Sequence, residues 1–275
     1  MNALDRFRLD GRVALITGGC GLLGRQHAAA IAAAGGTPVL LDIERADPGG
    51  VAAKLAAEFE SPCHGFVADI TRLGAVTEVK DRLLRELGRV DILINNAANN
   101  PKMDGADGGN SSRVEFYPME TWDADLAVGL TGAFLCSRVF GSEMAARGGG
   151  VIVNIASDLA LISPDQRLYG QPGLAPDAQP VKPVTYSVVK TGLLGLTRYL
   201  ATYWAQAGVR VNAICPGGVF TNQPGDFVAR LSQLIPLGRM ARMDEYQSAI
   251  LFLCSDASSY MTGANLVIDG GRTCW

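Results

Sequence analysis

The chain has 275 residues, 48% of them hydrophobic, with a formal net charge of -3 and a sequence pI near 5.5. This length fits one α/β domain and supplies enough apolar mass for a sizeable core. The charge excludes a basic nucleic-acid-binding surface, the apolar runs are too short for a membrane span, and the N-terminus lacks the apolar core of a signal peptide. We therefore expect one cytoplasmic domain over residues 1–275, with no nucleic-acid or membrane partner.

Cysteine and histidine are too scattered to form a metal site. The six cysteines include no Cys-x-x-Cys pair, and the two histidines, His27 and His64, have no cysteine cluster beside them. A zinc site needs clustered ligands. The pattern indicates free thiols in a reducing compartment and predicts no bound metal.

Short apolar runs alternate with longer Ala- and Leu-rich runs along the chain. We predict strands at residues 13–16, 38–42, 63–68, 92–95, 151–155, 210–214 and 266–268, and helices at residues 23–34, 48–58, 72–87, 119–147, 183–207, 225–234 and 244–254. Continuous apolar strands separated by helices predict a parallel sheet covered on both faces. Right-handed crossovers then give a single doubly wound sheet.

Two stretches are predicted to be long loops. Residues 99–112 are rich in Asn, Gly, Asp and Ser, and residues 163–183 contain five prolines, which forbid a regular helix or a central strand. Long loops within a compact domain are usually functional or disordered. We expect insertions near residues 99–118 and 161–183 to shape the binding of a small-molecule substrate.

A glycine-rich turn follows the first predicted strand and precedes the first predicted helix. It contains Gly18, Gly21 and Gly24, and the helix begins around Leu22 and Leu23. Small residues let the backbone approach a pyrophosphate, while the helix N-terminus supplies N–H donors and a positive dipole end. In this strand-turn-helix context the turn predicts a dinucleotide-binding Rossmann fold.

An acidic residue closes the second predicted strand. Asp42 lies 18 positions after Gly24, and a carboxylate there can accept both ribose hydroxyls of NAD and repel the 2′-phosphate of NADP. Asp42 as a helix cap or a solvated charge is the alternative, and the nearby Arg45 keeps that alternative open. The pattern favours NAD as the cofactor.

Three polar residues form a candidate catalytic group. Tyr186 and Lys190 are four positions apart at the start of a predicted helix, and Ser157 follows the strand predicted at 151–155. Residues four apart share a helix face, so the lysine can lower the pKa of the phenol from about 10. Such a tyrosine can exchange a proton with a hydroxyl while Ser157 holds the substrate oxygen. A surface Tyr/Lys pair is the alternative reading.

This combination resembles the short-chain dehydrogenase/reductase family, in its ordinary-length branch, almost end to end. Five segments resemble motifs of that family and occur in the same order. They are the opening at residues 7–18, the N-N-A-G-like run at 95–98, the serine segment at 153–157, the run at 210–219 and the C-terminal signature at 262–263 and 269–271. Their shared order and spacing carry the resemblance.

The resemblance implies an NAD-dependent oxidoreductase, usually a homotetramer, that transfers a hydride to or from an alcohol or ketone carbon. Catalysis would rest on Ser157, Tyr186 and Lys190, with Lys190 also binding the nicotinamide ribose. The other residues it implies at the cofactor are Asp69 and Ile70 near the adenine, Asn96 and Ala97 of the N-N-A-G-like run, and Pro216, Gly217, Val219 and Thr221 near the nicotinamide.

The chain departs from the family pattern at three points. Leu22 stands where the short branch usually has glycine, and this spacing is commoner in the longer sugar-nucleotide branch. Gly129 takes the position of the usual catalytic asparagine, and we hypothesise that its missing side chain leaves room for a water in the proton relay. Tyr186 lies 29 positions after Ser157, a much longer separation than usual.

The two predicted insertions supply amide and cationic donors. Asn99, Gln166 and Arg167 are the candidate substrate-binding residues. They suit a sugar, polyol or sugar acid better than an apolar substrate such as a steroid or a fatty acyl chain. Two other functions stay open: an NAD(H)-binding sensor or scaffold without turnover, and an epimerase or dehydratase that retains its NAD.

Overall fold

Seven parallel strands form one sheet in the order β3-β2-β1-β4-β5-β6-β7. The computed structural model describes residues 2–99 and 110–275. The strands are β1 (Val13–Thr17), β2 (Thr37–Asp42), β3 (His64–Val67), β4 (Ile92–Asn95), β5 (Gly150–Ile155), β6 (Val209–Pro216) and β7 (Asn265–Ile268). This order confirms the predicted doubly wound sheet. The chain adds strands outward in one direction from β1 to β3 and in the other from β4 to β7, and ligands bind at such a switch point between β1 and β4.

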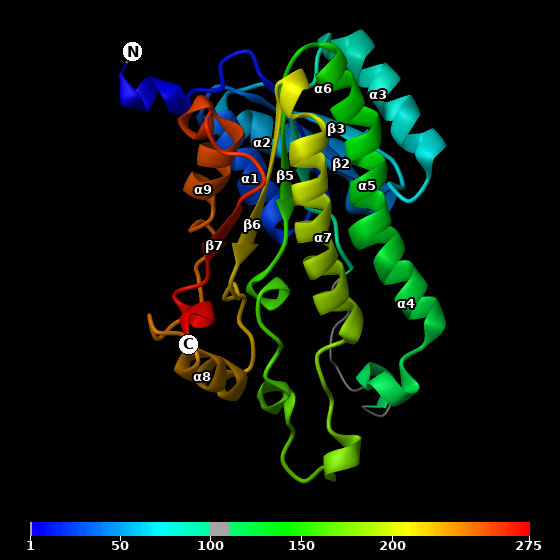
Figure 1. Cartoon of the computed structure of the whole chain (residues 1–275), viewed down its shortest axis with the longest axis vertical. Coiled ribbons are helices and arrows are strands. Elements are labelled where there is room, and N and C mark those ends of the chain that lie inside the picture. Colours follow the sequence, from blue (N-terminus) through cyan, green and yellow to red (C-terminus); the bar gives the residue numbers. More distant parts are fainter. Residues whose placement is uncertain (1, 100–109) are drawn as a thin grey trace.

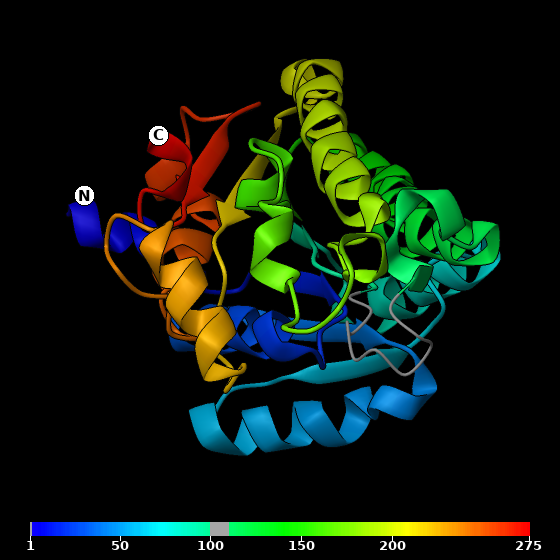
Figure 2. The same ribbon diagram turned by 90° about the horizontal axis from the view of Figure 1, so that it is seen from below.

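Helices cover both faces of the sheet, as Figures 1 and 2 show. One face carries α1 (Leu22–Ala33), α2 (Pro48–Phe59) and α9 (Gln247–Cys254), and the other carries α3 (Leu73–Leu87), α4 (Met119–Leu126), α5 (Gly132–Cys136), α6 (Ser142–Ala146) and α7 (Val184–Tyr203). Helix α8 (Gly225–Gln233) lies beyond the carboxyl ends of the strands, among the loops in the lower part of Figure 1.

The buried strands explain the two cores. Along β1, Ala14 and Ile16 pack on the α1 side, while Val13 and Leu15 pack on the α3 side. Successive side chains of a strand point to opposite faces, so a strand that is covered on both sides must be apolar throughout. All five residues of β1 are buried, which is why a continuous apolar run predicts this strand.

Helices α4, α5 and α6 continue one another through two π-helical turns, Ala127–Thr131 and Ser137–Gly141. By length and mean hydropathy alone this stretch of 28 residues could cross a membrane, which corrects the expectation that the apolar runs are too short. Its apolar side chains are used within the fold, because Cys136, Phe140 and Met144 are fully buried against the sheet.

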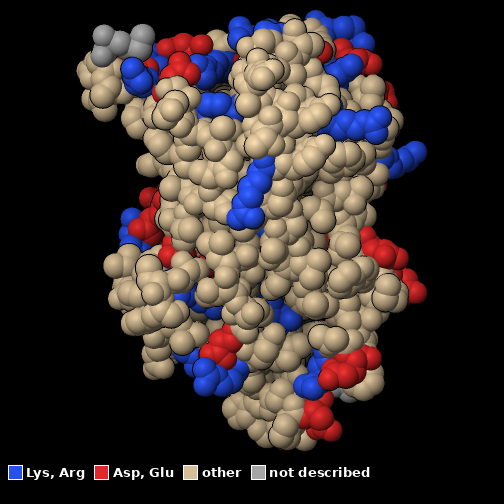
Figure 3. All heavy atoms as spheres, viewed as in Figure 1, with Lys and Arg blue, Asp and Glu red and all other residues tan. Residues whose placement is uncertain are grey.

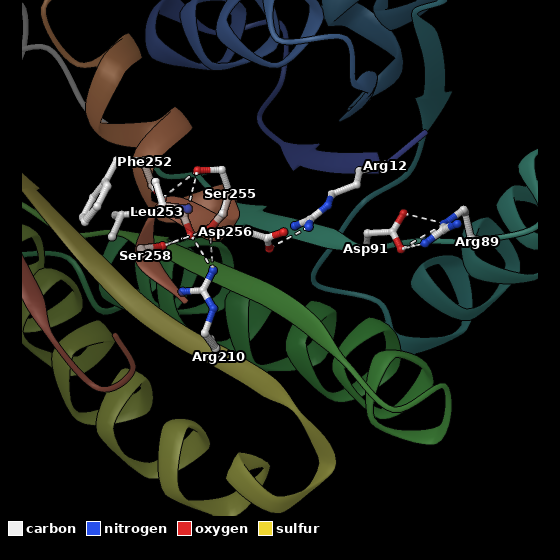
Figure 4. A network of polar contacts seen from close by, with 10 residues as sticks. Arg12, Arg89, Asp91, Arg210, Phe252, Leu253, Ser255, Asp256 and Ser258 are labelled. Carbon is white, nitrogen blue, oxygen red and sulfur yellow. Dashed lines mark hydrogen bonds and ion pairs between the residues drawn. The ribbon is translucent and has the colours of Figure 1, made fainter. Parts of the chain in front are cut away.

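The amino ends of the strands are joined by a polar network (Figure 4). Arg12, just before β1, forms an ion pair with Asp256 at 2.7 Å, and Arg210 in β6 donates to the carbonyl oxygens of Leu253 and Ser255. Asp91 accepts a bond of 2.8 Å from the backbone N–H of Val13. These contacts stabilise the edge opposite the carboxyl ends of the strands.

The two predicted loops hold each other at the carboxyl edge. The guanidinium of Arg113 donates to the carbonyl oxygens of Pro176 and Gln179, and the N–H of Val181 donates to Ser112 Oγ at 3.1 Å. As the prolines predict, the longer loop contains only 3-10 turns, Gln166–Tyr169 and Pro176–Ala178. Residues 100–109 of the other loop lie outside the described residues.

Candidate active site

A cleft of about 940 Å³ opens at the carboxyl ends of the strands. It takes residues from the ends of strands β1 to β6 and from the longer loop. Of the site residues predicted from the sequence, only Gln166 and Arg167 do not line it. Those that do are Gly18, Gly21, Leu22, Leu23, Asp42, Asp69, Ile70, Asn96, Ala97, Asn99, Ser157, Tyr186, Lys190, Pro216, Gly217, Val219 and Thr221. The fold thus gathers residues from across the chain at one edge.

The glycine turn fits an anionic pyrophosphate. Gly21 precedes α1, and no side chain caps the first turn of that helix. A Cβ at Gly24 would overlap the carbonyl oxygen of Gly18, so glycine is needed for the close packing of turn and helix. Asn96 holds the turn by donating from its side chain to the carbonyl oxygens of Thr17 and Gly18, both at 3.0 Å. The free helix N-terminus at the cleft wall can bind a dinucleotide phosphate.

Asp42 lies beside this turn at the end of β2. Its Oδ2 accepts a bond of 3.0 Å from the backbone N–H of Cys20, and its Oδ1 accepts one of 2.9 Å from Ile43 N–H. Asp42 therefore does not cap a helix, which was one alternative. Arg45 lines the same end of the cleft.

Ser157, Tyr186 and Lys190 meet in the middle of the cleft. The phenol oxygen of Tyr186 lies 3.4 Å from Ser157 Oγ, and Lys190 Nζ donates to the carbonyl oxygen of Ile155 at 2.7 Å. The serine comes from the segment after β5 and the other two from the first turns of α7. A hydroxyl substrate placed here can meet both oxygens, which is the geometry that proton exchange requires.

The pKa values in this group correct one expectation. Burial raises the pKa of Tyr186, and only the hydrogen bond with Ser157 and the charge of Arg272 oppose that change. Lys190 Nζ is 5.8 Å from the centroid of the Tyr186 ring, and it donates a hydrogen bond to the carbonyl oxygen of Ile155. Burial also lowers the pKa of Lys190 to about 8. In the protein alone, Lys190 does not lower the pKa of Tyr186 below its usual range.

A buried ion pair behind Ser157 was missed by the sequence reasoning. Ser157 Oγ donates to Asp158 Oδ1 at 2.8 Å, and Arg272 donates to Asp158 Oδ2 at 2.7 Å. The two charged side chains are 4% and 8% exposed. The pair fixes Ser157 and ties the C-terminal end of the chain to the active site. Arg272 has no local signal, because it is 114 positions away from its partner.

Gly129 does not leave the space that we expected. It lies in the first π turn, and a Cβ there would be 2.5 Å from Cγ1 of Val189 in α7, so Val189 already fills the volume. A separate cavity of about 10 Å³ next to Gly129 is also lined by Asp125, Tyr186 and Lys190. That volume is near the minimum for one water molecule. A proton relay through a water molecule therefore stays a prediction, with the water in this small cavity and not in the space of the missing side chain.

We expect Gly129→Ala to lower the free energy of unfolding by about 1–3 kcal/mol, because the added methyl group overpacks against Val189. Chemical denaturation monitored by circular dichroism measures this change. Gly195→Ala is the matched control, because Gly195 lies in α7 with open space around its Cβ position. There, alanine should stabilise by about 1 kcal/mol through helix propensity. Equal effects at both positions would show that Val189 does not crowd Gly129.

The structure does not bring Gln166 and Arg167 to the cleft wall. The Arg167 side chain is 88% exposed and pairs with Asp165, while Gln166 Oε1 accepts a bond of 2.8 Å from the Lys182 N–H. Their neighbours Leu168 and Tyr169 line the cleft instead, as does Lys182. The insertion thus reaches the site with other side chains than those predicted.

Gln223 is a further residue that the sequence reasoning missed. Its amide group accepts from the N–H of Thr221 at 2.7 Å and donates to the carbonyl oxygen of Val219 at 2.8 Å. It therefore fixes the backbone of the run after β6, which forms one wall of the cleft.

Comparison with known proteins gives the family. Residues 12–170 match the family described as short chain dehydrogenase, and residues 175–273 match the one described as Enoyl-(Acyl carrier protein) reductase. D-threitol dehydrogenase of Mycolicibacterium smegmatis is 35% identical over 272 residues, covering 97% of this chain and 95% of the relative. Galactitol 2-dehydrogenase (L-tagatose-forming) of Cereibacter sphaeroides is 35% identical over 276 residues, covering 98% of each.

A solved structure gives the same result for the fold. Gluconate 5-dehydrogenase from Burkholderia cenocepacia, in complex with NADP and tartrate, superposes with a TM-score of 0.85 at 29% identity over the whole of both chains. The chain belongs to the short-chain dehydrogenase family. It is accordingly an oxidoreductase of CH–OH groups that uses a nicotinamide cofactor.

Proposed function

We propose that the protein is an NAD-dependent dehydrogenase that interconverts a secondary alcohol and a ketone of a polyol, sugar or sugar acid. The observation that carries this proposal is the meeting of Ser157, Tyr186 and Lys190 in a cleft that also contains the glycine turn. The substrates printed in the names of the relatives, threitol, galactitol and gluconate, are all polyhydroxylated.

In this proposal Tyr186 takes the proton of the substrate hydroxyl during oxidation and returns it during reduction. Ser157 holds the substrate oxygen, in an orientation set by its bond to Asp158. Lys190, fixed by the carbonyl oxygen of Ile155, would bind the ribose of the cofactor and contribute positive charge near the phenol when the cofactor is bound. The nicotinamide, when bound, supplies the hydride acceptor or donor.

The polarity of the cleft supports a polyhydroxylated substrate. Beside the catalytic group it presents Asn99, Lys182, Gln223 and the Asp158–Arg272 pair. Charged and amide side chains at a cleft wall can hydrogen-bond to the hydroxyl groups of such a substrate. We propose that the two loops at the cleft, near residues 99–118 and 161–183, select the substrate.

Asp42 supports NAD rather than NADP. Its carboxylate, held at the glycine turn by Cys20 and Ile43, is available to accept ribose hydroxyls and repels a 2′-phosphate. Arg45 on the same wall is the feature that would favour NADP.

The experiment is an assay of NADH or NADPH formation across tetritols, pentitols, hexitols and sugar acids. We expect NAD to be used at least tenfold more efficiently than NADP. We expect Asp42→Asn to lower kcat/KM for NAD by about 10- to 150-fold, because a hydrogen bond to a charged group is worth about 1.5–3 kcal/mol. Arg45→Gln, which changes the opposing charge, is the control. A wild-type enzyme that prefers NADP, with no effect of Asp42→Asn, would contradict the assignment.

We also propose a cytoplasmic homotetramer. The face over α5, α6 and α7 carries few charged side chains (Figure 3), and Tyr199 and Tyr203 stack on it with their ring centroids 5.8 Å apart. Both tyrosines are exposed in the single chain, so an association between chains can bury them. All six cysteines are free thiols, which suits a reducing compartment.

A further inference from the structure

The loop between Ser157 and Tyr186 places a second lysine on the face of the catalytic tyrosine. Lys182 Nζ lies 4.0 Å from the centroid of the Tyr186 ring, whereas Lys190 Nζ lies 5.8 Å from it. Lys182 also lines the cleft together with Tyr186. The ammonium group closer to the ring therefore comes from the insertion and not from α7.

The position of Lys182 is fixed by the loops. Its backbone N–H donates to Gln166 Oε1 at 2.8 Å, and the preceding residue, Val181, donates to Ser112 Oγ at 3.1 Å. Pro183 follows directly and precedes the first residue of α7. The backbone is thus held on both sides of Lys182, and this directs its side chain over the ring one turn further along.

Several other groups face Tyr186 from the elements around it. Lys190 belongs to α7, Ser157 and Asp158 to the segment after β5, Tyr169 to the longer loop, and Arg272 to the C-terminal end. Asp158 disfavours the phenolate, but Arg272 offsets its charge at 2.7 Å. Asp125 lies across the small cavity that Tyr186 and Lys190 also line.

These surroundings leave the phenolate in need of positive charge. Burial raises the pKa of Tyr186, which makes it a weaker proton acceptor in neutral solution. Burial lowers the pKa of Lys182. Burial also lowers the pKa of Lys190, and the positive charge of Lys182 adds to that effect. The positive charges of the two lysines repel each other, and a negative charge on Tyr186, whose ring is near both, reduces that repulsion.

We propose that Lys182 is a positioning residue whose ammonium group, held over the ring of Tyr186, stabilises the phenolate form that accepts the substrate proton. A cation is attracted to the face of an aromatic ring, and the attraction grows when the ring carries a negative charge. Lys182 and Lys190 then both stabilise the phenolate of Tyr186, a role that was expected of Lys190 alone. The inference rests on the proposed function, because it concerns the base of that reaction.

The test compares Lys182→Met with Lys182→Arg in the pH dependence of kcat/KM for polyol oxidation. Removing a cation near the phenol raises its pKa, so the acid limb of the Lys182→Met profile should move to higher pH by about one unit. Activity near neutral pH should then fall about tenfold and recover at high pH. Lys182→Arg keeps the charge, so the acid limb of its profile should stay at the wild-type pH, whatever the absolute rate of the variant. Equal loss at every pH, or a rise in KM alone, would overturn the inference.

A second measurement needs neither substrate nor cofactor. The ionisation of Tyr186 is followed by tyrosinate absorbance, as the difference between proteins with and without the Tyr186→Phe change. We expect Lys182→Met to raise the midpoint of this ionisation by about one pH unit, and Lys182→Arg to leave it in place. An unchanged midpoint in Lys182→Met refutes the role of Lys182. If the wild type oxidises no polyol but the midpoint moves, the proposed function fails and the inference about the charge stands.

Discussion

The Tyr186→Phe variant is expected to turn over about 10²–10⁴-fold more slowly than the wild type while it still binds NAD. The change removes only the phenol oxygen, which lies 3.4 Å from Ser157 Oγ, and leaves the ring beneath Lys182. Proton transfer is then lost, whereas the glycine turn and Asp42 stay intact. Steady-state kinetics measures the first effect and calorimetric titration with NAD the second.

Tyr199→Phe is the matched control, because Tyr199 lies on the same helix, is exposed in the single chain and does not line the cleft. It should keep wild-type turnover. The comparison also separates the enzyme from a sensor that binds NAD without turnover. A Tyr186→Phe protein as active as the wild type would remove the tyrosine from the reaction.

Arg272→Met is expected to destabilise the protein by about 3–5 kcal/mol, because it leaves the buried carboxylate of Asp158 without its partner. Loss of that partner also frees Ser157, whose Oγ is bound to Asp158 at 2.8 Å, so we expect kcat to fall as well. Denaturant unfolding gives the free energy, and kinetics at a temperature where the variant is folded gives kcat.

The double variant Asp158→Asn/Arg272→Met distinguishes the ion pair from simple loss of packing. If the pair is the cause, the double variant should be more stable than Arg272→Met alone, since the unpaired charge is gone. Arg8→Met is the control for an exposed pair, because Arg8 binds Asp10 on the surface, where solvent screens the charges. An Arg272→Met protein that is as stable as Arg8→Met would show that the pair contributes little.

The sheet and its helices could be predicted because their signals are local. Continuous apolar runs such as residues 13–16 occur where a strand is covered on both faces, and the prolines of residues 163–183 exclude regular structure. The π turns in the helix at 119–146 were not predicted, because they change the hydrogen-bond register without changing the apolar pattern.

The meeting of the glycine turn, Asp42, Tyr186 and Lys190 in one cleft was also predictable, because the motifs that contain them depend on short spacings. The Asp158–Arg272 pair was not, because only the fold brings β5 and the C-terminal end together. Within the insertion, composition indicated polar residues but not their directions. Arg167 points to solvent, while Lys182, which the sequence did not single out, lies over Tyr186.

The most direct test of the central claim follows the hydrogen that leaves the substrate. A polyol that carries deuterium on its secondary alcohol carbons is incubated with the protein and NAD, and the released cofactor is examined by mass spectrometry. The account predicts NADH that carries one deuterium, together with the ketone. Unlabelled cofactor, with the polyol either unchanged or epimerised, would contradict it.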